Sequence, residues 1–214
     1  MVRQVCVGHV IPTQEVRVQQ VGETQPTVAQ QRVLDAAAAC FGERGFHGTT
    51  TRDIAKQAQL SPAVLYVHYP TKEDVLYEIS RAGHVAALEV LRAAAARGST
   101  PTEQLGELAQ DFALWHARSH AVARVVNYEL GALSPAHHEQ IALLRRQMEQ
   151  VTREVLEAGL DSGEFAVANT SLTALAVLSL GVDVGRWFKT TGTWQPEDVA
   201  KHYRELALRM VLAH

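Results

Sequence analysis

Cysteine is scarce in this chain, and that scarcity excludes one way of holding a fold together. Only two cysteines occur among 214 residues, Cys6 and Cys40, and they form no Cys-x-x-Cys pair. A disulfide framework or a cysteine-based zinc site is therefore not expected. Two isolated thiols suit a reducing compartment, so we expect a cytoplasmic protein.

Long apolar runs are also missing. The N-terminus has no apolar core of the kind that a signal peptide contains. The most apolar run, residues 172–182, ends at Asp183 and is too short to cross a bilayer. We expect this run to form a buried helix, and we expect no membrane partner.

The motifs of common catalytic and cofactor sites are absent as well. The sequence contains no phosphate-binding loop, no dinucleotide fingerprint and no nucleophile elbow. Ten histidines are present, but none follows a glutamate by three residues and no His-Glu-x-x-His motif occurs. We therefore expect no enzymatic activity, no cofactor and no metal site.

Charge of either sign is modest. Twenty Lys and Arg stand against 23 Asp and Glu, a formal net charge of −3. A chain of this charge is not a general polyanion binder. Any affinity for DNA has to come from a few placed cations, from helix N-termini and from dimerisation.

What the chain does contain is helical periodicity throughout its folded part, with no strand alternation and no internal repeat. The predicted fold class is all-α. Caps, prolines and glycines predict helices over 27–45, 72–97, 102–118, 121–133, 135–158, 170–188 and 196–212, with a loop over 163–167. Glycine at 159 is expected to stop the helix that begins at 135.

Three regions follow from this pattern. Residues 1–26 have no helical period and are interpreted as a flexible N-terminal arm; the alternative is an arm that tracks the minor groove through Arg3 and Arg17. Residues 27–71 are expected to form a three-helix helix-turn-helix domain. Residues 72–214 are expected to form a helical domain for ligand binding and dimerisation.

The segment 45–72 predicts two short helices joined by a tight turn. Thr50 and Asp53 have the spacing of a capping box, Ser61 caps the second helix, and Pro62 fits its first turn. The inward apolar positions are Ile54, Ala55, Ala58, Leu60 and Leu65. The outward groups are Ser61, Ala63, Val64 and Tyr66, which are small enough to enter the major groove.

Residues 28–80 resemble the DNA-binding domain of TetR-family transcriptional regulators. The matching positions are Phe41, Arg44-Gly45-Phe46, Thr49-Thr50, Asp53-Ile54-Ala55, Leu65-Tyr66 and Thr71-Lys72-Glu73. The resemblance implies a repressor that binds a palindromic operator as a dimer. The chain departs from the family at Gln59, where glycine is usual. That residue either takes a left-handed conformation, at a cost of about 1 kcal/mol, or adjusts the turn.

The resemblance also implies which residues touch DNA. They are Thr50, Thr51, Arg52, Ser61, Pro62, Ala63, Val64, Tyr66, His68, Tyr69 and Lys72. Ala63 and Val64 are expected to face bases. Tyr66, His68, Tyr69 and Lys72 are expected to hold phosphates.

The later helices suggest a dimer interface and a cavity. The last two helices are apolar over wide faces, so we expect a homodimer through them, with intramolecular packing as the alternative. Polar groups embedded among apolar ones predict a cavity lined by Trp115, His116, His120, Arg124, Asn127, Tyr128, Arg145, Arg186 and Trp187. This pattern resembles the TetR branch that senses CoA thioesters, which implies an acyl-CoA-like effector. The alternative is that each group is an ordinary surface residue or a core polar residue with its hydrogen bonds satisfied.

Two other functions stay open on the sequence alone. One is a constitutive DNA-binding protein with no small-molecule effector. The other is a ligand-binding protein that has lost DNA recognition, which Gln59 and the low basic charge allow.

Overall fold

The computed structural model describes residues 26–212, and within that range the chain is all-α, as predicted. Cys6 and the expected arm, apart from Pro26, lie outside the described residues. The helices are α1 (Val28–Arg44), α2 (Thr51–Gln57), α3 (Pro62–His68), α4 (Lys72–Arg97), α5 (Pro101–Arg118), α6 (His120–Tyr128), α7 (Pro135–Asp161), α8 (Thr170–Trp187) and α9 (Pro196–Val211). A 3-10 turn, η1 (Leu130–Ala132), follows α6.

Local start signals explain where most of these helices begin. Thr27, Thr50 and Thr71 each form a complete capping box, with Gln30, Asp53 and Asp74 as the reciprocal partners. Ser61 accepts the Val64 N–H at the start of α3. These caps satisfy backbone donors that the first turn of a helix leaves unpaired.

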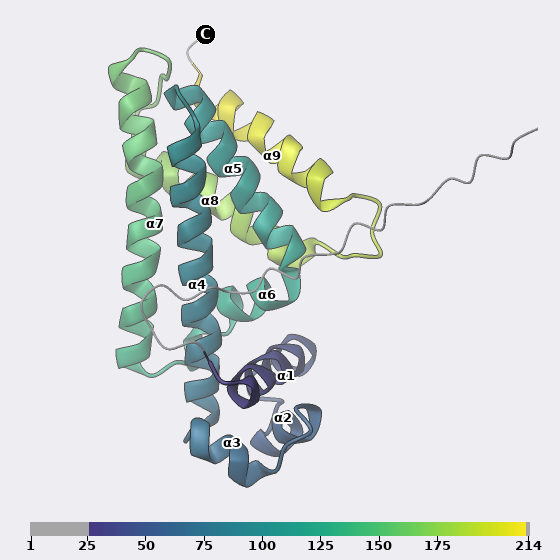
Figure 1. Cartoon of the computed structure of the whole chain (residues 1–214). Coiled ribbons are helices and arrows are strands. Elements are labelled where there is room, and N and C mark those ends of the chain that lie inside the picture. The colour runs from purple at the N-terminus through teal and green to yellow at the C-terminus, as the bar shows by residue number, and fades with distance from the viewer. Residues whose placement is uncertain (1–25, 213–214) are drawn as a thin grey trace, which may run out of the picture.

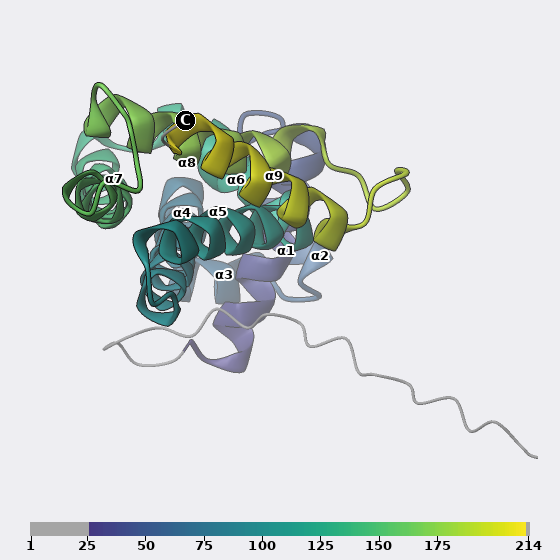
Figure 2. The ribbon, with the colours of Figure 1, turned by 90° about the horizontal axis from the view of Figure 1, so that it is seen from above.

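The long helix α4 joins the two ends of the molecule. Figure 1 shows α1, α2 and α3 at one end and α5, α8 and α9 at the other, and Figure 2 views the same bundle from above. An N-terminal apolar cluster includes Val75 and Leu76 of α4, whereas a C-terminal cluster includes Leu88 and Leu91 of the same helix. A shift of α4 at one end is therefore transmitted to the other through packed side chains.

The N-terminal cluster does not stop at the predicted domain boundary. Val125 and Val126 of α6 and Ile141 of α7 pack into it together with Phe41 and Ile54. Gly83 of α4 makes this approach possible, since a Cβ there would lie 2.9 Å from Val126 Cγ1. The head formed by α1–α3 is thus seated on α6 and α7.

Two predicted helix ends were wrong. The helix expected over 121–133 ends at Tyr128 and gives way to η1. Gly159 does not stop α7, which continues to Asp161. A Cβ at Gly159 would lie 1.9 Å from the ring of Phe165, so this glycine admits a buried aromatic ring instead of ending the helix.

The apolar run 172–182 is only partly buried. Within α8, Ala174, Val177 and Leu178 face the C-terminal cluster, whereas Leu172 is 64% exposed and Leu175 is also exposed. The expectation of a buried helix therefore holds for only one side of α8. No helix in residues 26–212 has the length and hydropathy that a membrane span requires.

Gln59 adopts the left-handed conformation, with a φ of 55°, in the turn between α2 and α3. Arg32 steadies the turn by donating to the carbonyls of Ala58 and Gln59, at 2.5 and 3.3 Å. A side chain with a Cβ atom is sterically unfavourable in this left-handed conformation. We therefore expect Gln59→Gly to raise the free energy of unfolding by about 0.5–1 kcal/mol. Urea denaturation measures this change.

The matched control is Gln57→Gly, at the exposed last residue of α2, where φ is not positive. Glycine at this position is expected to lower the free energy of unfolding, by at most about 1 kcal/mol. Destabilisation by both substitutions would show that the turn is not strained.

Candidate nucleic-acid interface and cavity

Helix α3 is anchored by one fully buried side chain, that of Leu65, which packs in the N-terminal cluster with Ile54 and Ala55. The remaining side chains leave the outer surface open: Ser61, Pro62, Ala63, Tyr66 and Val67 are exposed. Together with α2, this helix lies at the end of the molecule remote from α9 (Figure 1). A short, rigidly seated helix with small exposed side chains fits the major groove of DNA.

Side chains of α2 support this surface. Thr51 Oγ1 lies 2.9 Å from Tyr66 Oη, so the hydroxyl groups tie α2 to α3. The Thr50 hydroxyl donates to Asp53 Oδ2 at 2.7 Å. That bond and the Thr50 backbone N–H lower the pKa of Asp53, so its charge is kept as part of the cap. Arg52 is exposed beside them and is the cation of α2 nearest its N-terminus.

Two of the residues expected to hold phosphates make other contacts in this structure. Tyr69 is only 6% exposed and belongs to the N-terminal cluster. Burial, with a smaller contribution from Glu78, raises the pKa of its phenol to about 12. The Lys72 ammonium donates to the carbonyls of Phe46 and Thr49, at 2.6 and 2.7 Å, and lies 4.1 Å from the centre of the Phe46 ring. Lys72 therefore ties the start of α4 to the segment before α2.

We expect Lys72→Met to destabilise the head without changing the salt dependence of DNA binding. Loss of two charge-assisted bonds to carbonyls costs about 1–3 kcal/mol of unfolding free energy, measured by urea denaturation. The exposed Lys56 of α2 supplies the control Lys56→Met. Unchanged stability together with a salt slope lower by about one unit would restore the phosphate contact.

A cavity of about 590 Å³ lies among α4, α5, α6, α7 and α8. Its lining is mainly apolar: Gly83, Ala87, Phe112, Trp115, Val126, Met148, Leu175, Leu178 and Val182. The polar groups are His84, His116, Asn127, Tyr128, Arg145, Arg146, Glu149, Ser179 and Asp183. An apolar cavity with a few polar groups is the usual form of a small-molecule site.

Two buried histidines from different helices face this cavity. His84 Nδ1 lies 2.7 Å from the Ser80 carbonyl oxygen, and His116 Nδ1 lies 2.8 Å from that of Phe112. Burial is the main cause that lowers the pKa of each imidazole from 6.5 to about 4. Both rings are therefore neutral at neutral pH.

The outer part of the cavity carries charges of both signs. Arg145 and Arg146 are exposed on α7, and Arg146 pairs with Glu139 at 2.6 Å. Asp183 also lines the cavity, but its carboxylate is bound by Arg186 at 2.6 and 2.9 Å, which lowers its pKa. Arg145 also lines the cavity, and no acidic side chain among residues 26–212 forms an ion pair with it.

Five of the nine residues expected to line a cavity do so: Trp115, His116, Asn127, Tyr128 and Arg145. The other four lie outside it. His120 packs its ring edge on Phe188, and Arg124 is exposed. Arg186 is paired with Asp183, and Trp187 packs against a separate small cluster containing Phe188 and Val199.

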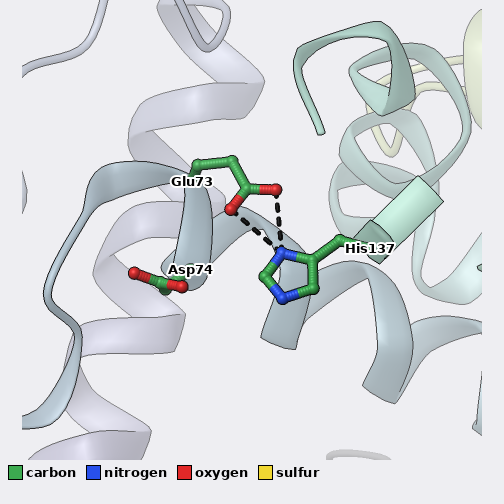
Figure 3. A group of neighbouring side chains, drawn as sticks. All are labelled: Glu73, Asp74 and His137. Atoms are coloured by element: carbon green, nitrogen blue, oxygen red, sulfur yellow. Dashed lines mark hydrogen bonds and ion pairs between the residues drawn. The ribbon is translucent and has the colours of Figure 1, made fainter. Parts of the chain in front are cut away.

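A polar joint links the start of α4 to the start of α7. Glu73 accepts the Ser134 N–H at 2.7 Å. It also accepts a hydrogen bond from His137 Nδ1 at 2.9 Å (Figure 3). The His137 ring stacks on Tyr77, with centroids 3.8 Å apart. Ligand atoms of Glu73, Asp74 and His137 lie within 4.8 Å of one another, as a cation site would need. Asp74, however, is taken up by the cap of α4, so the joint is explained by its hydrogen bonds.

Models of two protein families match the chain. The C-terminal domain of tetracyclin repressor-like proteins matches residues 98–211, and the bacterial regulatory proteins of the tetR family match residues 33–79. The chain belongs to the TetR family. Its helix-turn-helix, α2 and α3, is therefore the DNA-binding element of a transcriptional regulator.

Individual relatives agree with this TetR-family assignment. The HTH-type transcriptional repressor KstR2 of Rhodococcus jostii (strain RHA1) is 28% identical over 178 residues, 82% of this chain and 87% of that protein. The crystal structure of a tetR-family regulatory protein from Rhodococcus RHA1 is 40% identical, with a TM-score of 0.84, and covers 88% of this chain and 100% of that chain. AibR, solved with isovaleryl coenzyme A and operator DNA, shares the fold, with a TM-score of 0.76 at 21% identity over 83% of this chain and 97% of that chain.

The helix over 72–97 was expected to wall the cavity of this TetR-family chain, but none of its residues was named among the lining. Gly83, His84 and Ala87 lie on one side of α4 and face the cavity. Their spacing of three and four residues was a usable signal, because it places a histidine between two small residues on one helix face.

Proposed function

We propose that this TetR-family chain is a homodimeric repressor that binds a palindromic operator through α3 and releases it when a CoA thioester occupies the cavity. The observation that carries the proposal is the path of α4. This helix starts beside α3, where Lys72 is bound to the segment before α2, and then contributes His84 and Ala87 to the cavity wall. An effector that moves α4 therefore changes the position of the DNA-binding head.

The polar joint gives this movement a second route. Glu73 and His137 connect the first turns of α4 and α7, and α7 also carries Arg145 and Met148 into the cavity lining. A ligand that separates α4 from α7 acts on both ends of this joint. Because the coupling is thermodynamic, operator DNA must weaken effector binding by the same factor.

The exposed side of α8 supports dimerisation. Leu172, Leu175 and Ser179 form a stripe on α8, and Met210 is exposed on α9. Apolar stripes of this kind suit a helix-to-helix contact between two copies. Such a dimer has to hold the two α3 helices about 34–36 Å apart to reach successive major grooves.

The effector class rests on the shape and charge of the cavity. The apolar depth fits an acyl or ring group, and Arg145 offers a cation to an anionic phosphate near the outside. Titrating acyl-CoA esters, with free CoA as the control, against this protein bound to the DNA upstream of its own gene tests the proposal by gel shift. Release by an ester is expected. Binding that no ester releases would indicate a constitutive regulator, and absence of any shift would indicate a ligand-binding protein.

A further inference from the structure

The two buried histidines of the cavity have a defined tautomer. A carbonyl oxygen carries no proton, so the short contacts from His84 Nδ1 to Ser80 and from His116 Nδ1 to Phe112 require the proton on Nδ1. A neutral ring protonated at Nδ1 presents an unprotonated Nε2, which only accepts hydrogen bonds. Each ring is almost completely enclosed, with His84 4% and His116 2% exposed.

The Nε2 atoms of these two rings accept no hydrogen bond from the described part of the chain. A nearby Asn127 adds a further acceptor, because its amide nitrogen donates to the Ala123 carbonyl at 2.8 Å and leaves Oδ1 free to accept. The fully buried side-chain polar atoms without a partner in residues 26–212 are Ser80 Oγ and Arg153 Nε, so each Nε2 retains accessible surface, and both histidines line the cavity.

Aromatic side chains surround the His116 ring. The His116 ring meets Phe112 and Trp115 edge-on, with centroids 4.3 and 4.8 Å away. Metal binding by the two imidazoles lacks a third ligand, because the group Glu73, Asp74 and His137 is the only cluster of that kind in residues 26–212. The inner wall therefore offers acceptors and no donor of its own from these rings.

We propose that His84 and His116 select an effector whose acyl or ring body carries a hydroxyl group, which donates to Nε2. This inference rests on the proposed CoA-thioester function and adds the chemistry of the part inside the cavity. An unsubstituted acyl chain brings only the thioester carbonyl, an acceptor that cannot pair with another acceptor. A site built to bind a substrate hydroxyl discriminates strongly against the analogue that lacks it.

The test compares octanoyl-CoA with its β-hydroxy and ω-hydroxy derivatives, measured by calorimetric titration of the full chain at neutral pH. At least one hydroxy derivative is expected to bind about 10-fold or more tightly than octanoyl-CoA. His84→Leu and His116→Leu are expected to remove this preference. His138→Leu, an exposed histidine of α7 outside the cavity, is the matched control and keeps it.

The outcomes separate the two proposals. Equal affinity for all three esters would reject the role of the histidines while leaving the effector class standing. Absence of binding by all three would reject the effector class and this inference with it.

Nitrogen NMR of the histidine-labelled protein gives a second readout that does not depend on the variants folding. Protonated Nδ1 and unprotonated Nε2 are expected in both rings, and a protonated Nε2 in either ring would overturn the proposal.

Discussion

Replacing Ala63 with glutamate is expected to lower the affinity for operator DNA by about 100-fold or more and to leave the fold intact. Ala63 is exposed in the first turn of α3, where an acidic side chain is compatible with the helix dipole. In the major groove the same carboxylate meets base edges and neighbouring phosphates without a cation to pair with. Loss of one base contact costs about 1–3 kcal/mol, and a dimer carries the substitution twice. Fluorescence anisotropy with a labelled operator fragment measures the change.

The control for this prediction is Ala93→Glu, at an exposed position of α4 far along the helix from the head. It adds the same charge to the molecule and tests whether net charge alone reduces the affinity. Operator binding by Ala63→Glu within about twofold of the unsubstituted protein would show that the exposed side of α3 does not face the DNA.

Acidification from about pH 6.5 to pH 4 is expected to remove several kcal/mol of stability. His84 and His116 have a folded pKa of about 4 against an ordinary value of 6.5. The unfolded chain therefore binds two protons that the folded chain excludes, and stability falls as the pH drops through this window. The slope approaches about 1.4 kcal/mol per pH unit for each ring. Urea denaturation at a series of pH values measures it.

Carboxylates act in a different window. The pKa values of Asp53 and Glu164 are lowered from 3.8 and 4.5, so their contribution is present above those values and is lost as the pH falls through the lower, folded values. His84→Gln and His116→Gln should each reduce the slope between pH 6.5 and 4, and His138→Gln, at an exposed position, should leave it unchanged. A stability that stays constant down to about pH 4.5 would mean that these rings are not buried and neutral in solution.

Features governed by neighbouring residues were predictable from the sequence. Thr50 and Ser61 marked helix starts because a cap depends on residues within one turn. The helix-turn-helix followed from these caps and from the apolar spacing around Leu65. Even the departure at Gln59 had a local solution, the left-handed backbone conformation.

Features governed by distant residues were not predictable in this way. Whether Gly159 ends a helix depends on Phe165 filling the space beside it. The role of Lys72 depends on carbonyls more than twenty residues earlier, at Phe46 and Thr49. Tyr66 and Tyr69 are both tyrosines, three residues apart. The packing of the N-terminal cluster decides that the phenol of Tyr66 is exposed and that of Tyr69 is buried.

At the site, too, neighbouring residues gave usable predictions and distant residues did not. Polar residues concentrated in α5 and α6 indicated a cavity, yet four of the nine proposed lining residues lie elsewhere, because helix rotation within the bundle sets which side chains face inward. The joint between Glu73 and His137 spans 64 residues of sequence and left no local signal.

If α4 connects the two sites as proposed, the cavity and the operator-binding surface share one free-energy coupling. Measuring the dissociation constant of an acyl-CoA ester with and without saturating operator DNA, and that of the operator with and without saturating ester, tests this coupling most directly. Both constants are expected to rise by the same factor, typically between about 5-fold and 150-fold. An ester that binds in the cavity with the same affinity in the presence and absence of operator DNA would show that the two sites are not coupled.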